Sequence, residues 1–201
     1  ASQEGQVVRR PTGPSMRTSA PQPWQLVGMV GLYSRRRARP GAPPPMTAPV
    51  PFGRYLLIER VATGAMAEVF VARVAEGEGA GRLVAVKRLW PALAEDPALV
   101  AMFLDEARIA VQLDDPSVPR VDDLGQQGAS YYIAMEYVPG KDLEAVLGAL
   151  AARGRRLPPE LAAFVAAGVL GALDHAHARR DAAGRTLGVV HRDVSPRNVL
   201  L

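Results

Sequence analysis

The sequence predicts an α+β protein in which a small antiparallel sheet precedes a helical region. Between about residues 54 and 136, short apolar runs alternate with glycines and polar clusters, a pattern typical of strands joined by turns. After Gly140 the chain changes to longer segments rich in Ala and Leu, which is typical of helices. We therefore expect a strand-rich half followed by a helical half.

The first 51 residues differ in composition from the rest of the chain. Residues 1–52 contain seven Arg, one Glu and ten of the 18 prolines. The prolines within 40–51 are too dense for a helix or a central strand. We interpret residues 1–51 as a disordered tail and linker, and we expect the folded domain to span residues 52–201.

Composition also bears on partners and location. Because the excess of positive charge lies in the tail, it gives no reason to expect nucleic acid as a partner of the folded domain. The apolar stretch 24–33 is too short to cross a bilayer with a hydrocarbon core of about 30 Å, so we expect no membrane segment. Contact of this stretch with a membrane surface or a partner stays an alternative. The absence of Cys agrees with a cytoplasmic location.

The first half is expected to contain strands and one helix. The strands are predicted at about 54–62, 67–75, 82–89, 121–126 and 131–136. A helix is predicted to begin with Asp96 as its N-cap and Pro97 as its first residue, and to end before Pro116. Its apolar stripe consists of Leu99, Met102, Phe103, Ile109, Ala110 and Leu113. Glu106 falls on this stripe, so it either needs a cation as partner or lies at the solvated edge of the stripe.

The second half is expected to contain a helix over about 142–152 and a longer one over about 159–178. The longer helix has no charged residue between positions 161 and 173, which favours a helix packed inside a protein over a membrane span. It is apolar around so much of its circumference that we expect it to pack against further neighbours. We therefore expect the 201 residues by themselves to be poorly soluble.

Two segments have the residue types required for phosphate chemistry. In the predicted strand Val84-Ala85-Val86-Lys87, alternation places Ala85 and Lys87 on one face, where a small residue beside a cation leaves room for a flat ring next to a phosphate. Asp193 and Asn198 are five positions apart in one loop. That spacing suits phosphoryl transfer, since a carboxylate can orient a hydroxyl while an amide oxygen binds Mg²⁺.

Four segments in this order resemble protein kinases of the bacterial serine/threonine type: 61–70, 84–87, 135–138 and 191–201. The resemblance covers roughly residues 52–201. It implies a bilobal protein-kinase-like fold with a small antiparallel-sheet lobe over 52–135, a hinge over 136–140 and the first helices of the helical lobe over 141–201.

The resemblance also implies roles for individual residues, with ATP and Mg²⁺ as cofactors. Lys87 would contact the α- and β-phosphates and pair with Glu106, Asp193 would orient the substrate hydroxyl, and Asn198 would bind Mg²⁺. The remaining nucleotide-binding positions implied are Val61, Gly64, Val69, Ala85, Met135, Glu136, Val138, Asp142 and Leu200. For Asp142, an N-cap of the helix that follows is an equal alternative.

The chain departs from the kinase pattern in two places. Of the three glycines of the phosphate-binding loop only Gly64 is present, and Ala62 and Ala67 occupy the outer positions, which we expect to stiffen the loop because alanine disfavours positive φ. Ser195 stands where serine/threonine kinases have a Lys that contacts the γ-phosphate. Arg197 stands where tyrosine kinases often have Arg, and we hypothesise that it supplies the missing charge.

The resemblance implies an ATP-dependent protein kinase that phosphorylates Ser or Thr hydroxyls of protein substrates. The thinned glycine loop and Ser195 leave a nucleotide-binding pseudokinase or scaffold as an alternative, and a small-molecule kinase of the aminoglycoside or choline type is less favoured. An Asp-Phe-Gly segment, which supplies a second metal ligand in this family, does not occur in residues 1–201. We therefore expect these 201 residues by themselves not to transfer phosphate at a useful rate.

Overall fold

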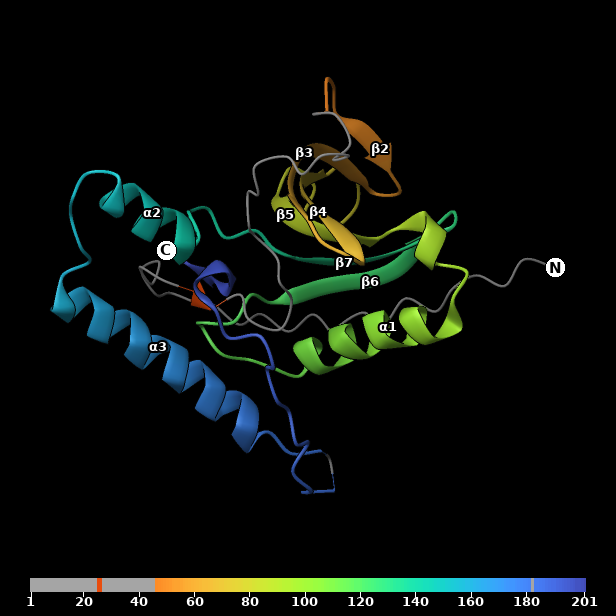
Figure 1. Cartoon of the computed structure of the whole chain (residues 1–201). Coiled ribbons are helices and arrows are strands. Elements are labelled where there is room, and N and C mark those ends of the chain that lie inside the picture. The colour runs from red at the N-terminus through yellow and green to blue at the C-terminus, as the bar shows by residue number, and fades with distance from the viewer. Residues whose placement is uncertain (1–24, 27–45, 182) are drawn as a thin grey trace. The chain divides into compact units, whose positions relative to one another are not determined.

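The computed structural model describes residues 25–26, 46–181 and 183–201 (Figure 1). Most of the predicted tail therefore lies outside the described residues. The described chain divides into two compact units. Unit 1 holds residues 46–111 and 120–137, and the other described residues form unit 2. The boundary after Tyr137 falls within the segment that the sequence assigns to the hinge.

Unit 1 is built on a six-stranded antiparallel sheet in the order β2-β3-β4-β5-β7-β6. The strands are β2 (Val50–Phe52), β3 (Tyr55–Thr63), β4 (Ala67–Val74), β5 (Leu83–Leu89), β6 (Val121–Gln127) and β7 (Ser130–Glu136). Five of them match the predicted strands to within one residue at each end. The agreement follows from the turn residues, since glycines and polar clusters separate the apolar runs at these points.

Strand β2 corrects the predicted start of the folded domain. The sequence places residues 40–51 in a linker, but Val50–Phe52 pairs with the start of β3. Pro51 has no N–H to donate, which a strand at the edge of a sheet tolerates because its outer side has no neighbour. Gly53 makes the turn between the two strands with a φ of 55°, a conformation that favours glycine.

The two faces of the sheet have different neighbours. One face forms an apolar cluster that consists of Phe52, Tyr55, Leu57, Phe70, Ala72, Val74, Val84, Val86, Tyr132 and Ala134. Within it, the Tyr132 ring makes edge-to-face contacts with Phe52 and Tyr55 at centroid distances of 5.5 and 5.6 Å. Helix α1 (Pro97–Val111) packs along β6 and supplies the partner of Lys87 on the other face.

Helix α1 begins where the sequence predicts. The Asp96 carboxylate accepts a hydrogen bond from the Ala98 N–H at 2.9 Å, as an N-cap does. Its buried residues are Phe103, Ala107 and Ala110. The predicted stripe is wrong at Met102, which is exposed. A helix turns about 100° per residue, so Met102 points away from the sheet when its neighbour Phe103 points towards it. A short 3₁₀ helix, η1 (Pro91–Leu93), lies between β5 and α1.

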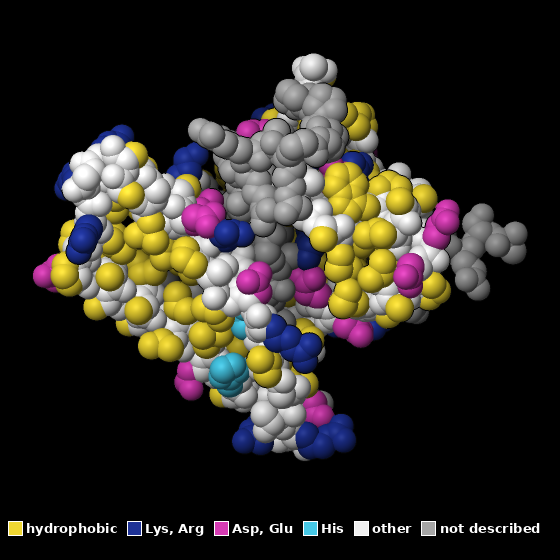
Figure 2. Space-filling view, in the orientation of Figure 1, with side chains coloured by type: hydrophobic (Ala, Val, Ile, Leu, Met, Phe, Trp, Pro, Cys, Tyr) yellow, Lys and Arg dark blue, Asp and Glu magenta, His cyan; other side chains and the backbone are white. Residues whose placement is uncertain are grey.

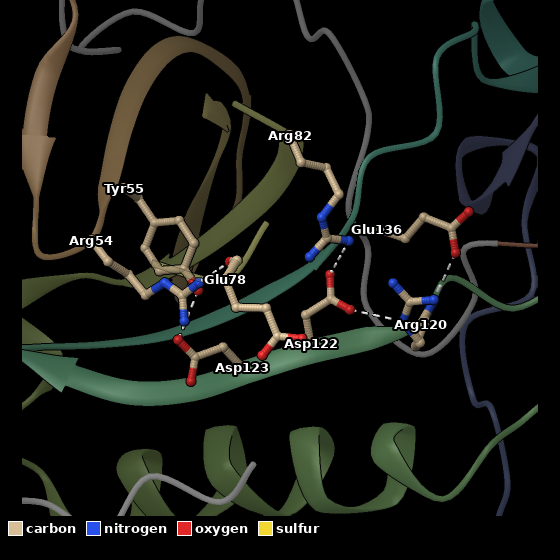
Figure 3. A network of polar contacts seen from close by, with 8 residues as sticks. All are labelled: Arg54, Tyr55, Glu78, Arg82, Arg120, Asp122, Asp123 and Glu136. Atoms are coloured by element: carbon tan, nitrogen blue, oxygen red, sulfur yellow. Dashed lines mark hydrogen bonds and ion pairs between the residues drawn. The ribbon is translucent and has the colours of Figure 1, made fainter. Parts of the chain in front are cut away.

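A polar network connects the strands of unit 1 (Figure 3). The buried Asp123 carboxylate accepts hydrogen bonds from the Tyr55 hydroxyl at 2.7 Å and the Tyr132 hydroxyl at 3.1 Å. Beside it, Asp122 forms ion pairs with Arg82 and Arg120, both at 2.8 Å. The hydroxyls from β3 and β7 thus compensate for the burial of a carboxylate on β6.

Glu68 is an almost completely buried acid that the sequence analysis missed. Its side chain lies in β4 with 2% exposed, and its two oxygens pair with Arg60 of β3 at 3.2 Å and Arg88 of β5 at 2.6 Å. The Arg88 guanidinium also lies over the Phe52 and Phe70 rings, at 5.6 and 5.0 Å from their centroids. Strand alternation could have predicted the burial of Glu68, because Glu68 shares its face of the strand with the apolar Phe70.

Unit 2 contains helices α2 (Leu143–Ala151) and α3 (Pro159–Ala178), the 3₁₀ helix η2 (Pro196–Asn198) and two short strands. Both α-helices agree with the predicted ranges to within one residue. Strand β8 (Val199–Leu200) pairs with β1 (Gln25–Leu26), a pairing that the sequence analysis did not predict. The apolar core of this unit consists of Val165, Ala172 and Val199 with Val118, Leu143, Val169 and Leu201 packed against it.

Only one side of α3 is covered. Val165, Gly168, Ala172 and Ala176 are buried, whereas Leu161, Phe164 and Leu170 are exposed, Leu170 by 65%. Figure 2 shows hydrophobic side chains along the surface of this helix. The prediction of a buried helix thus holds for one face. By length and hydropathy, α3 is the one helix in the described part of the chain that would suffice to cross a membrane, a property that core helices of soluble proteins also have.

Candidate functional site

Lys87 and Glu106 form the ion pair that the sequence analysis expects. The Lys87 ammonium donates to both carboxylate oxygens of Glu106 at 2.9 Å. The two side chains are 11% and 22% exposed, and the ammonium lies 5.5 Å from the centroid of the Phe103 ring. Burial lowers the pKa of Lys87 and raises the pKa of Glu106, and the attraction between the two opposes both changes. Each group therefore depends on the other to stay charged.

Strand register gathers the residues assigned to the nucleotide around Lys87. Val69 of β4 lies directly opposite Lys87, and Met135 of β7 lies directly opposite Ala85. Directly paired residues share a face, so these side chains and the ammonium lie on the same face of the sheet. Val61 is buried but falls at an irregularity between Arg60 and Ala62. It is Ala62, and not Val61, that pairs with Val69.

The loop between β3 and β4 differs from the expectation based on its alanines. It is short, and the Gly64 N–H donates to the Ala67 carbonyl at 2.8 Å. Ala62 and Ala67 lie in strands, and no alanine among the described residues has a positive φ. The expected cost of alanine at positive φ does not arise in this conformation, because the strands extend up to the loop on both sides.

The segment assigned to the hinge is held at Glu136. Its N–H donates to the Arg120 carbonyl at 2.8 Å, and its carboxylate accepts from the Arg120 N–H at 3.3 Å. The backbone N–H of Glu136 is therefore already used by a bond within the protein. Val138, the second residue assigned to adenine contact, is buried.

In unit 2, the structure brings Asp142 and Leu200 together. An antiparallel bridge joins their backbones, flanked by two hydrogen bonds between Lys141 and Leu201 at 2.9 and 3.1 Å. The buried Asp142 carboxylate accepts from the Ala145 N–H at 2.7 Å and caps α2. The N-cap alternative for Asp142 is therefore confirmed. Gly140 is required here because a Cβ atom would collide with the Leu201 carbonyl.

Asp193 and Asn198 are in direct contact. The Asn198 amide nitrogen donates to the Asp193 carbonyl at 2.7 Å and to one carboxylate oxygen, Oδ2, at 3.0 Å. His191 also orients Asp193, since its Nδ1 accepts from the Asp193 N–H at 3.0 Å. Asn198 is buried and Asp193 is exposed. Because the amide nitrogen faces Asp193, the amide oxygen is the atom through which Asn198 would bind a cation.

These side chains fit the needs of Mg²⁺ in part. The residues that the structure describes contain no group of three or more His, Cys, Asp or Glu that could hold a metal ion by itself. Mg²⁺ is commonly held by one or two protein oxygens together with substrate phosphates and waters. The Asn198 amide oxygen fits that coordination as a single protein ligand.

Arg197 has a partner that the sequence analysis did not foresee. Its Nε donates to a Glu144 carboxylate oxygen of α2 at 2.9 Å, and both side chains are about half exposed, at 47% and 50%. The hydrogen bond from Glu144 raises the pKa of Arg197, and the carboxylates of Asp193 and Asp142 add to this effect. Arg197 thus lies in an acidic environment that includes Asp193.

The Lys87–Glu106 pair yields a stability prediction. Glu106→Gln should lower the free energy of unfolding by about 3 kcal/mol, because it leaves a mostly buried ammonium without its counter-charge. Lys87→Met combined with Glu106→Leu should cost less than Glu106→Gln alone. Urea unfolding followed by circular dichroism measures both. Asp105→Asn is the matched control, since Asp105 pairs with Arg108 on the exposed side of the same helix, and it should change stability by less than about 0.5 kcal/mol. Equal losses in Glu106→Gln and Asp105→Asn would contradict the prediction.

His191 yields a prediction on pH. Burial lowers the pKa of His191 below its ordinary value of about 6.5, with the Asp193 carboxylate opposing the change. Between pH 7 and pH 5 the unfolded chain then binds a proton before the folded chain does, so stability falls as pH falls. His191→Gln should make this decline shallower, whereas His177→Gln, an exposed position on α3, should not. The prediction is wrong if urea unfolding at pH 5, 6 and 7 gives the same slope for His191→Gln and the unmodified chain.

Comparison with known proteins places this geometry in a family. Residues 55–201 match the sequence model of the family described as "Protein kinase domain". The tyrosine-protein kinase MasK of Myxococcus xanthus is 36% identical over 170 residues, which cover 80% of this chain and 26% of MasK. The serine/threonine-protein kinase PrkC of Bacillus subtilis is 34% identical over 149 residues, which cover 74% of this chain and 21% of PrkC.

The fold has solved counterparts as well. The crystal structure of the PknI kinase domain of Mycobacterium tuberculosis is similar with a TM-score of 0.58 and 32% sequence identity, over 78% of this chain and 58% of that structure. The chain thus spans about a quarter or less of the length of the two curated relatives and under two thirds of the PknI structure. The chain belongs to the protein kinase family, among the bacterial kinases that these relatives represent.

Proposed function

We propose that this chain supplies the ATP-binding and catalytic-loop residues of a kinase that transfers the γ-phosphate of ATP to Ser or Thr hydroxyls of protein substrates. The observation that carries the proposal is the Lys87–Glu106 ion pair, in which both carboxylate oxygens fix one mostly buried ammonium on a sheet face. An ammonium held in this way is suited to bind phosphate oxygens. A cytoplasmic location, where ATP is available, is part of the proposal.

In unit 1, the residues act as a preformed half of the ATP site. Lys87 binds the α- and β-phosphate oxygens, and Glu106 keeps its ammonium in place. Val69, Ala85 and Met135 share the face of Lys87 and are buried and apolar, which suits them to contact the adenine ring. Ala85 matters for its size, since a larger side chain would fill the space beside the ammonium.

In unit 2, Asp193 accepts the proton of the attacking hydroxyl. Asn198 already donates to its Oδ2, so Oδ1 is the oxygen that would accept the proton of the hydroxyl. As the hydroxyl oxygen bonds to the γ-phosphorus, the bond from that phosphorus to the β-phosphate oxygen breaks, ADP leaves, and the proton passes to Asp193. Mg²⁺, bound through the Asn198 amide oxygen, would neutralise charge on the phosphates. Asn198 orients the carboxylate through its bond to Oδ2, and His191 fixes the Asp193 backbone by accepting its N–H.

Arg197 supplies the charge that Ser195 lacks. Its guanidinium is held through Nε by Glu144, and the other two nitrogens of the fork are suited to a γ-phosphate oxygen. Glu144 first, and then the Asp193 and Asp142 carboxylates, raise the pKa of Arg197, and a guanidinium is protonated at neutral pH in any case. A pseudokinase, the alternative suggested by Ser195, would lack such a substitute.

Tyrosine phosphorylation is a second candidate activity. MasK, which is named a tyrosine-protein kinase, is 36% identical to this chain, and Arg197 occupies a position where tyrosine kinases often have Arg. PrkC, named a serine/threonine-protein kinase, is 34% identical. Phosphoamino-acid analysis of products formed by the kinase domain that contains these residues distinguishes the two, and phosphoserine or phosphothreonine is expected.

The first test of the proposal is nucleotide binding by the 201-residue chain. Calorimetry should detect Mg·ATP binding, and Lys87→Met should weaken it at least about tenfold, since a hydrogen bond to a charged group contributes about 1.5–3 kcal/mol. Lys141→Met, which removes the only other lysine, is the matched control. The 201 residues alone should transfer little labelled phosphate. Labelling that disappears in Asp193→Ala would show that they suffice for transfer, and unchanged affinity in Lys87→Met would refute the ATP site.

Arg197 is tested by turnover in the kinase domain that contains these residues. Arg197→Ala should lower kcat about 100-fold, the usual loss when a donor to developing charge is removed. Glu144→Gln should lower kcat less, because the guanidinium remains. Arg185→Ala breaks a comparable exposed pair with Asp181 and should leave kcat unchanged. Unaltered turnover in Arg197→Ala would show that Arg197 does not replace the missing Lys.

A further inference from the structure

Trp90, the residue after β5, is bonded to the loop between β3 and β4 at two points. Its indole N–H donates to the Gly64 carbonyl at 3.1 Å, and its backbone N–H donates to the Met66 carbonyl at 3.0 Å. The Gly64 N–H closes the loop by donating to Ala67 at 2.8 Å. The loop Gly64, Ala65 and Met66 is thus held by the residue that directly follows the strand of Lys87.

The indole bond fixes the orientation of one peptide unit. In a trans peptide the carbonyl of one residue and the N–H of the next point in opposite directions, and the described residues contain no cis peptide. With the Gly64 carbonyl directed at Trp90, the Ala65 N–H points away from Trp90. Ala65 is exposed and lies outside the strand pairing, which leaves its N–H available as a donor to an anion.

The base of the loop is fixed independently. Glu68, directly after Ala67, bridges Arg60 of β3 and Arg88 of β5. Arg88 is two residues before Trp90, so the loop is fixed on the β5 side both at its base by an ion pair and at its tip by the indole. Rotation of the Gly64–Ala65 peptide would break the indole bond without disturbing Glu68.

We propose that Trp90 is a positioning residue of the phosphate-binding loop, which locks the Gly64–Ala65 peptide so that the Ala65 N–H is presented to a phosphate oxygen of the nucleotide. This inference rests on the proposed function. It explains how the loop works with one glycine where the family has three. Glycines let backbone amides adapt to the phosphates; here a side chain fixes one amide in advance, which lowers the entropy lost on binding.

The test compares Trp90→Phe with the unmodified 201-residue chain by calorimetry, using Mg·ATP and adenosine as ligands. Phenylalanine keeps a ring but has no N–H donor. Mg·ATP should bind about fivefold more weakly, which corresponds to about 1 kcal/mol for one hydrogen bond. Adenosine, which has no phosphate, should bind with less than a twofold change.

The outcomes separate this inference from the function on which it rests. If the unmodified chain binds Mg·ATP and Trp90→Phe binds it equally well, or loses adenosine affinity to the same extent, Trp90 does not position the phosphate loop. If the unmodified chain binds neither ligand, the proposed ATP site is wrong. In that case the inference fails with it, because there is then no nucleotide phosphate to which the Ala65 N–H could donate.

Discussion

The ion pair between Lys87 and Glu106 is the constraint on which the architecture of unit 1 depends. It forms between the third long strand and the one α-helix described in that unit, at 2.9 Å, with both groups mostly buried. Burial works against the charge of each group, so the pair is stable only if strand and helix are placed accurately. The Asp96 cap fixes where the helix starts, and Phe103 fixes which face it turns to the sheet.

Other buried polar groups also require the strands of unit 1 to be placed accurately. Glu68 joins three neighbouring strands, β3, β4 and β5, through two arginines, and Asp123 joins β6 to β3 and β7 through tyrosine hydroxyls. Each of these groups would be costly without its partners, so each favours one strand register over its alternatives. In unit 2, Asn198 and His191 hold Asp193 in a similar way, through a side chain and a ring nitrogen. Polar groups with fixed partners thus orient the candidate catalytic residues of both units.

The sequence predicts most elements but few of the tertiary contacts. Turn residues and the Asp96-Pro97 pair are local signals, and the predicted strands and helices match because such signals act within a few residues. Strand β2 was missed because Pro51 excludes only a central strand, and its edge position depends on the whole sheet. The pairing of Lys87 with Glu106 was expected from the family resemblance. The contacts of Arg197 with Glu144 and of Trp90 with Gly64 join residues far apart in the chain, and no spacing rule indicates them.

A crystal structure of the chain with Mg²⁺ and a non-hydrolysable ATP analogue tests the central claim most directly. The account predicts that the Lys87 ammonium lies within hydrogen-bond distance of α- or β-phosphate oxygens while it remains bonded to Glu106. The adenine ring should lie against Val69 and Ala85. A nucleotide bound elsewhere, or an ammonium that contacts only Glu106 while the phosphates lie out of reach, would contradict it.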